Sequence, residues 1–281
     1  MIKVVTDSSV DLPEEIAREL DITIVPLTIH FGDRTYLDRQ DIDPATFYRM
    51  LAAEHVHPRT AQPSVGLFEE AFRRLAAAGH DILVITIGAT FSGTMNSAAL
   101  ATQGVPDARV TLIDSGTVSM AMGSMVIRAA RLAREGRDMA TIEAAVRDMM
   151  PRLRLCLLAD TLTYLQRGGR IGRAQAMAGS LLNIKPILTI SRGEVTPLAR
   201  VRSRAKGLHE MVEFLRAGAP LEEVYVMHTA APQLGDELAA LLQPVFGQTP
   251  PVLPLGPVVG VHLGPGSAGA IGLSRTGNPH P

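Results

Sequence analysis

The strongest constraint on the fold is a set of three apolar runs in the first half of the chain. They are IKVVT, DILVITIG and RVTLIDS, at residues 2–6, 81–88 and 109–115. The middle run is almost continuously apolar after Asp81, which is typical of a strand buried on both faces of a parallel sheet. Helical patterns separate the runs. We therefore expect a doubly wound, parallel-sheet α/β domain over residues 1–150.

Capping residues and helical periodicity indicate the helices of this domain. A helix is expected after Ser64, with apolar residues at helical spacing and an end at Gly79. Further helices are expected from Met95, over 117–135 and over 139–150.

Residues 11–51 show less regular secondary-structure patterns than the rest of this domain. One strand is expected over 22–32, with Pro26 marking an edge or a bend. Asp11 is expected to cap the helix that follows the first strand. Asp43-Pro44 is expected to open another helix, which runs through Leu51.

The pattern changes after Pro151, where strands come closer together. The expected elements are strands LRLCLLA, IKPILTI and EVYVMHT, a hairpin at Arg192-Gly193, and helices over 204–216 and 232–242. This predicts an α+β domain with a mixed sheet over 151–281. The final residues, SRTGNPHP, are expected to be frayed.

Composition narrows the class of protein. The 281 residues carry 27 Lys and Arg against 28 Asp and Glu, so no basic field favours nucleic acid or a membrane surface. The one cysteine, Cys156, lies in an apolar run and is expected to be a buried, inert thiol. No signal peptide is visible at the start, and no apolar run approaches the ~20 residues of a membrane span. We expect a cytoplasmic protein.

Small hydroxyl and acidic residues follow the predicted strands. They are Asp7-Ser8-Ser9, Ser92-Gly93-Thr94 and Asp114-Ser115, and ligands of open α/β sheets bind at such strand ends. Ser64 and Thr94 are expected to cap helices. Thr60 and Ser92 stand away from the cap positions and are the better candidates for ligand contacts.

Two arginine clusters and one histidine complete the candidate residues. LQRGGRIGR, at 165–173, holds Arg170, and ARVRSRAKG, at 199–207, holds Arg202. Such clusters favour an anion. His262 precedes a glycine-rich stretch, GVHLGPGSAG, which we interpret as a rigid loop that holds an imidazole able to donate to an anion or shuttle a proton near neutral pH.

Several motifs of other functions are absent or fail. GPGSAG matches a dinucleotide-binding pattern, but no βαβ unit follows it. No P-loop is present, and FSGT lacks the surroundings of a nucleophile elbow. His55 and His57 have no matching set of ligands, so no metal is expected.

Taken together, several stretches resemble the DegV family of bacterial fatty-acid-binding proteins over nearly the whole chain. They are VVTDSSVDLP, TAQPS, FSGT, LQRGGRIG, LLNIKPIL, VRSRAKG and GVHLGPGSAG. Ala61 replaces the usual Ser of the second motif. Ala205 and Gly207 depart from the pattern of the sixth.

The resemblance implies two domains with a long-chain fatty acid such as palmitate buried between and within them. By motif, Thr60 and Ser92 would bind the carboxylate. Arg170, Arg202 and His262 would line the route to the surface and face a phosphate or a partner. The family implies a lipid-binding protein rather than an enzyme: the subunit of a fatty acid kinase that binds no ATP itself and presents the lipid to a separate kinase subunit. No cofactor besides the fatty acid is implied.

Two other functions remain open from the residues. A serine-dependent esterase or acyltransferase would use Ser92 with His262, although no third orienting residue is evident. A lipid-sensing regulator would act by domain closure, although no DNA-binding signature is present.

Overall fold

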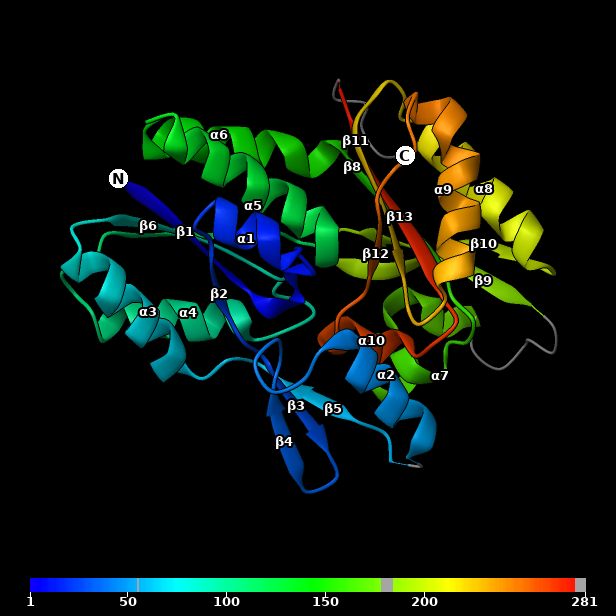
Figure 1. The fold of residues 1–281 in the computed structure, drawn as a ribbon, viewed down its shortest axis with the longest axis horizontal. Coiled ribbons are helices and arrows are strands. Elements are labelled where there is room, and N and C mark those ends of the chain that lie inside the picture. The colour runs from blue at the N-terminus through cyan, green and yellow to red at the C-terminus, as the bar shows by residue number, and fades with distance from the viewer. Residues whose placement is uncertain (55, 178–183, 276–281) are drawn as a thin grey trace. The chain divides into compact units, whose positions relative to one another are not determined.

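The computed structural model describes residues 1–54, 56–177 and 184–275, and it divides into two compact units (Figure 1). The first unit contains Met1–Asp41 with Thr60–Met150. The second contains Ile42–Arg59 with Pro151–Pro281, so residues 42–59 group with the C-terminal half of the chain.

A four-stranded parallel sheet forms the centre of the first unit, in the order β2-β1-β6-β7. Its strands are β1 (Ile2–Asp7), β2 (Thr23–Val25), β6 (Asp81–Thr86) and β7 (Val110–Asp114). Residues 82–86 of β6 are fully buried, as the apolar run predicted. Since all four strands are parallel, their carboxyl ends lie along one edge of the sheet.

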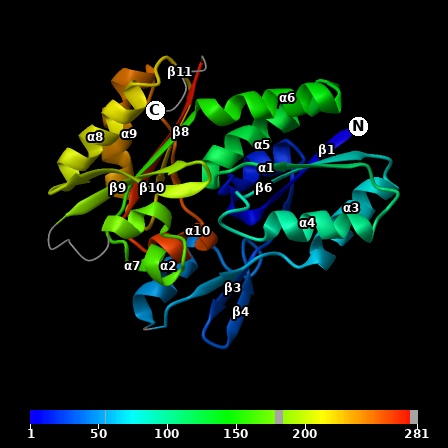
Figure 2. The same cartoon turned by 180° about the vertical axis from the view of Figure 1, so that it is seen from behind.

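Helices cover both faces of this sheet, as Figures 1 and 2 show from opposite sides. α3 (Val65–Ala77) and α4 (Thr94–Gln103) lie on one face, and α5 (Ser119–Arg134) and α6 (Met139–Met149) lie on the other. A short 3-10 helix, Ser8–Val10, follows β1 and leads to α1 (Glu14–Glu19). The core under α3 joins Phe68 and Phe72 to the sheet.

Pro26 separates two strands that belong to different sheets, so the expectation of a single strand over 22–32 is wrong. β2 ends at Val25, and β3 (Thr28–Phe31) pairs with β4 (Arg34–Leu37) in a three-stranded sheet of order β4-β3-β5, where β5 is Arg59–Ala61. Proline has no N–H for a ladder, and the next N–H, of Leu27, donates to the Ser8 hydroxyl at 3.0 Å. The chain therefore leaves the first sheet here.

The two expected helix caps near the N-terminus have different outcomes. Asp43 caps α2 (Pro44–Ala53), because its carboxylate accepts the Thr46 N–H at 2.7 Å. Asp11 does not cap α1. It is left-handed, with φ 49°, and it ends the preceding 3-10 helix, whereas α1 begins after Pro13 without a side-chain cap.

The second unit contains a six-stranded mixed sheet of order β10-β9-β8-β13-β11-β12. The strands are β8 (Leu153–Leu158), β9 (Lys185–Ser191), β10 (Glu194–Val201), β11 (Leu221–His228), β12 (Val252–Pro254) and β13 (Ala268–Ser274). β11 and β12 are parallel, and the other pairs are antiparallel. The predicted hairpin joins β9 to β10 through Arg192 and Gly193, both at positive φ, as a type I′ turn requires.

Helices of the second unit form two groups. α8 (Arg204–Arg216) and α9 (Pro232–Phe246) pack on one face of the sheet, over Cys156, which is fully buried as expected. α7 (Thr163–Arg167), α10 (Pro257–Leu263) and α2 lie together at one end of it (Figures 1 and 2). A short 3-10 helix at Gly172–Met177 belongs to this unit, and another at Met150–Arg152 leads from the first unit into β8.

The stretch GVHLGPGSAG was expected to form a rigid loop, but most of it lies in a helix and a strand. Its first part is the last turn of α10, which carries His262, and its last part opens β13, at the centre of the sheet. Only the turn between them is irregular, with Gly264 and Gly266 at positive φ. Glycines suit β13 because neighbours come close: a β-carbon on Gly269 would lie 3.2 Å from the Cys156 carbonyl oxygen. Residues 276–281, expected to be frayed, lie outside the described residues.

Candidate functional site

The acidic residues at the strand ends of the first unit hold its loops together. The buried Asp7 carboxylate accepts the N–H groups of Ser9 and Ile87, at 3.0 and 2.7 Å, and so ties the end of β1 to the end of β6. Burial raises the pKa of Asp7, although these hydrogen bonds oppose the rise. Asp114 likewise accepts the N–H groups of Ala89 and Gly116. These two carboxylates brace the start of the loop that carries Ser92.

Ser92 lies in the loop before α4 and is half-buried. Its hydroxyl is 2.8 Å from the Thr94 hydroxyl and accepts the Thr94 N–H at 3.3 Å. Thr94 is the first residue of the helix rather than its cap, so that expectation is wrong. Ser64, by contrast, caps α3 as expected. The paired hydroxyls of Ser92 and Thr94 offer both donors and acceptors to a ligand.

Thr60 lies on β5. Gln62, which follows this strand, contacts both α4 and the loop that carries Ser92. The Gln62 side chain donates to the Ser97 hydroxyl of α4 at 2.9 Å. It also packs on the backbone of Gly93, where a β-carbon would lie 2.0 Å from its Oε1. The structure therefore brings the segments of the two predicted hydroxyls together. Gln62 is the contact that sequence reasoning missed, since nothing in the pattern TAQPS shows which residue reaches α4.

In the second unit, His262 and Arg170 lie beside the Gly168-Gly169 turn. The imidazole packs directly on Gly168, where a β-carbon would lie 2.2 Å from Nδ1. Arg170 is exposed and donates to the Gly168 carbonyl oxygen at 2.7 Å. The glycine turn thus places the two predicted residues next to each other.

We expected His262 to titrate near neutral pH from its residue type, and this expectation is wrong. Burial is the main cause that lowers its pKa to about 4, and the charges of Arg170 and His57 lower it further. At pH 7 the ring is neutral. It remains a hydrogen-bond donor through one nitrogen, but it is not a proton shuttle in this state.

His57, from the segment between α2 and β5, contributes a second imidazole to this end of the unit. Its ring lies over Tyr164 of α7, with centroids 5.6 Å apart. The pKa of His57 is lowered by burial and by the charges of Arg167 and Arg59. No metal ligands surround it in a matching set; within the described ranges, no group of three or more His, Cys, Asp or Glu side chains is arranged to hold a metal ion.

Contacts with Asp160 distinguish Arg204 from Arg202 in the motif VRSRAKG. Lys185 and Arg204 contact the Asp160 carboxylate at 2.6 and 3.0 Å. Burial raises the pKa of Asp160, but these two partners outweigh it and bring the pKa below its ordinary value. Arg202 is exposed ahead of Ser203, the cap of α8. Among the described residues, Arg204 of this motif pairs with an acid and Arg202 does not.

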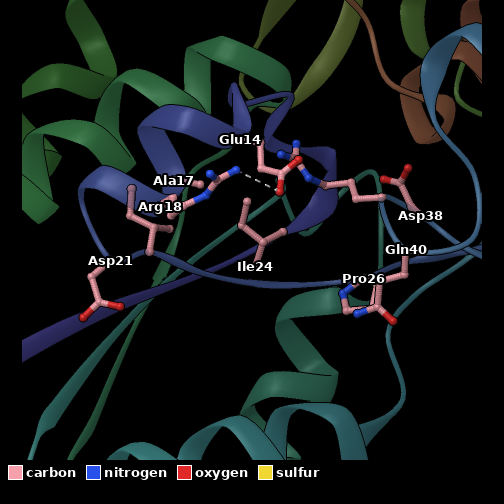
Figure 3. Close-up of a pocket in the computed structure, with 10 residues that line it drawn as sticks. Glu14, Ala17, Arg18, Asp21, Ile24, Pro26, Asp38 and Gln40 are labelled. Carbon is pink, nitrogen blue, oxygen red and sulfur yellow. Dashed lines mark hydrogen bonds and ion pairs between the residues drawn. The ribbon is translucent and has the colours of Figure 1, made fainter.

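A surface pocket of about 340 Å³ lies elsewhere on the first unit (Figure 3). Its lining residues are Glu14, Ala17, Arg18, Asp21, Ile22, Ile24, Pro26, Asp38, Arg39 and Gln40. Glu14 and Arg18, one turn apart on α1, form an ion pair at 3.4 Å among these residues. Neither Thr60 nor Ser92 lines this pocket, so it is distinct from the predicted ligand contacts.

The family model described as "Uncharacterised protein, DegV family" matches residues 1–275. The chain belongs to the DegV family. A DegV domain-containing protein of Caldanaerobacter subterraneus subsp. tengcongensis is 35% identical over 272 residues, which cover 95% of this chain and 97% of the relative. The resemblance stated from the motifs is thereby confirmed.

Solved DegV structures share the fold. A DegV family protein from Thermus thermophilus, described by its fatty acid binding, has a TM-score of 0.88 at 32% identity, covering 97% of this chain and 99% of its own. A DegV family protein from Eubacterium eligens, loaded with heptadecanoic acid, has a TM-score of 0.86 at 26% identity, covering 98% and 100%. The predicted fold class, a parallel-sheet α/β domain with a mixed-sheet α+β domain, is confirmed.

Helix length bears on membrane insertion. Within residues 1–54, 56–177 and 184–275, every helix is too short or too polar for a bilayer crossing.

Proposed function

We propose that this protein binds a long-chain fatty acid and that Thr60 and Ser92 hydrogen-bond its carboxylate. The observation that supports this most strongly is the match, over 97% of the chain, to a DegV structure described by its fatty acid binding. The local geometry agrees, because Gln62 joins the Thr60 strand to the Ser92 loop. Hydroxyl donors satisfy a buried carboxylate, which is costly to leave unpaired.

Burial of the acyl chain supplies the affinity in this proposal. Each buried methylene contributes ~0.8 kcal/mol, so a chain of ~14 methylenes offsets a large ordering cost. Hydroxyls rather than a fixed cation at the carboxylate leave its oxygens free to react. We further propose that the protein presents the carboxylate to a separate, ATP-dependent fatty acid kinase subunit, with Arg170, Arg202 and His262 facing the phosphate or that partner.

Mass spectrometry of the purified protein tests lipid binding first. We expect the native protein to carry a mass near that of a C16 or C18 fatty acid, which is released on denaturation. The Thr60→Ala/Ser92→Ala double variant should lose it. Thr196→Ala is a matched control, since that hydroxyl donates to the Glu194 carbonyl within β10. A protein that is empty and takes up no added fatty acid contradicts the proposal.

Phosphorylation of the bound lipid tests the presentation role. With a fatty acid kinase subunit and ATP, acyl phosphate is trapped with hydroxylamine and counted. Arg202→Ala and His262→Ala should lose this product while retaining bound fatty acid; unchanged turnover overturns the presentation role.

Hydrolysis of a chromogenic ester tests the alternative function. Activity that disappears in Ser92→Ala would favour a serine-dependent esterase. In the structure, the Ser92 hydroxyl hydrogen-bonds with the hydroxyl and the N–H of Thr94.

A further inference from the structure

The segment between α2 and β5 has a defined place in the second unit. Pro58 is buried, and the adjacent His57 ring lies over Tyr164 at 5.6 Å between centroids, with 38° between the ring planes. Tyr164 is itself in close contact with Gly264, because a β-carbon on Gly264 would lie 2.2 Å from its Cδ2. These contacts of Tyr164 place the His57 imidazole beside α7, close to the end of α10.

A polar atom of this imidazole lacks a partner. Nε2 of His57 is buried and has no hydrogen bond among the described residues. A buried ring nitrogen without a partner costs stability, so a purely structural histidine normally pairs with a carbonyl or a carboxylate. The unsatisfied atom indicates a ligand.

The charges around His57 indicate which kind of ligand. The charged groups that lower its pKa, after burial, are Arg167 of α7 and Arg59 of β5. Those that lower the pKa of His262 are Arg170 and His57 itself. The charged neighbours that shift the two rings are therefore all basic. Such a set is compensated by a multiply charged anion rather than by a cation.

We propose that His57, with Arg59 and Arg167, extends the surroundings of His262 and Arg170 into a site for a phosphoryl dianion, in which Nε2 of His57 donates to a phosphoryl oxygen. Three guanidinium groups match a dianion better than they match a single carboxylate. The proposal rests on the presentation role for the source of the phosphoryl group, but the site itself binds inorganic phosphate without lipid.

Nuclear magnetic resonance of the histidine rings tests the site in the full-length protein. Ring signals are assigned with His57→Gln and His262→Gln, and inorganic phosphate is then titrated at constant ionic strength, with sodium acetate as a parallel monoanion. We expect the His57 and His262 signals to move together and to saturate with phosphate. Acetate should produce little change at the same concentrations.

Variants identify the contribution of His57. His57→Ala should weaken phosphate binding roughly tenfold, the loss expected for one charge-assisted hydrogen bond. His57→Gln keeps an N–H donor near Nε2 and should restore part of the affinity. Arg167→Gln, an exposed change on α7, should weaken binding independently. His209→Gln is the matched control, because that ring contacts the Ala205 carbonyl within α8.

Two results overturn the proposal: His57 signals that stay fixed while His262 saturates, or wild-type phosphate affinity in both His57→Ala and Arg167→Gln. Bound fatty acid is measured by mass spectrometry in the same samples. A protein that binds phosphate but no lipid contradicts the proposed function and leaves this site intact. A protein that binds lipid while neither ring responds to phosphate contradicts this site alone.

Discussion

A β-carbon on Gly168 would lie 2.2 Å from Nδ1 of His262. That distance is shorter than any van der Waals contact, so the imidazole occupies space that only glycine leaves open. We predict that Gly168→Ala displaces the His262 ring and lowers acyl phosphate formation while the bound fatty acid is retained. Ring NMR signals report the displacement.

Gly169→Ala provides the comparison within the same turn. Gly169 has φ 68° and no atom within 4 Å of an added β-carbon, so this change strains the backbone without touching His262. We expect about 1 kcal/mol of lost stability in thermal unfolding and an unchanged His262 signal. Equal displacement of the ring in both variants would show that the turn, rather than the contact, positions His262.

Gly93 and Gln62 form a second close contact that can be tested by complementary changes. A β-carbon on Gly93 would lie 2.0 Å from Gln62 Oε1, and the Gly93 φ of −75° is open to alanine. Gly93→Ala should therefore push Gln62 away from Ser97 and reduce the amount of bound fatty acid several-fold. Removing the obstructing side chain, in Gly93→Ala/Gln62→Ala, should restore part of it. A double variant that binds no better than Gly93→Ala would contradict this packing.

Asp38 should make stability fall as the pH rises through the acidic range. Its carboxyl is buried, and neither oxygen has a hydrogen bond of good geometry among the described residues. Burial raises its pKa from the ordinary 3.8 to about 6; the nearby Ser8 hydroxyl and Arg39 charge oppose this, and Asp7 adds to it. The folded state therefore holds the proton more tightly than the unfolded state. The resulting stability is full below pH ~4 and is lost as the pH rises through 6, by about 3 kcal/mol.

Asp38→Asn removes this titration. We expect a flatter profile of unfolding free energy between pH 4 and 6 and higher stability at pH 7, measured by chemical denaturation. Asp43→Asn is the control of opposite sign, because hydrogen bonds from Thr46 lower the pKa of Asp43 and its contribution is lost as the pH falls. An Asp38→Asn profile that parallels the wild type would contradict the assignment.

The Cys156 thiol should be unreactive in the folded protein. It is fully buried, and burial raises its pKa to about 12, so almost no thiolate exists at pH 8. We expect a thiol reagent to modify it at the rate of unfolding in buffer and within seconds in guanidinium chloride. Fast labelling of the native protein would show that this face of the sheet opens locally.

The elements predicted with success are those that the sequence encodes locally. The apolar run at 81–88 became the buried β6, Asp43-Pro44 opened α2, and Arg192-Gly193 formed a turn with both residues at positive φ. In each case the deciding physics lies within a few neighbouring residues: a continuous apolar run, a capping carboxylate or glycine conformational freedom. The order of the motifs also identified the family.

The tertiary structure decided what depends on residues far apart in the chain. Pro26 divided an apolar run between two sheets, and the end of GVHLGPGSAG became part of a central strand, because distant strands supplied their hydrogen-bonding partners. The low pKa of His262 likewise depends on burial and on charges from Arg170 and His57, which no local pattern contains. Residue types along the chain determined the candidate groups; long-range packing decided which of them meet and in which charge state.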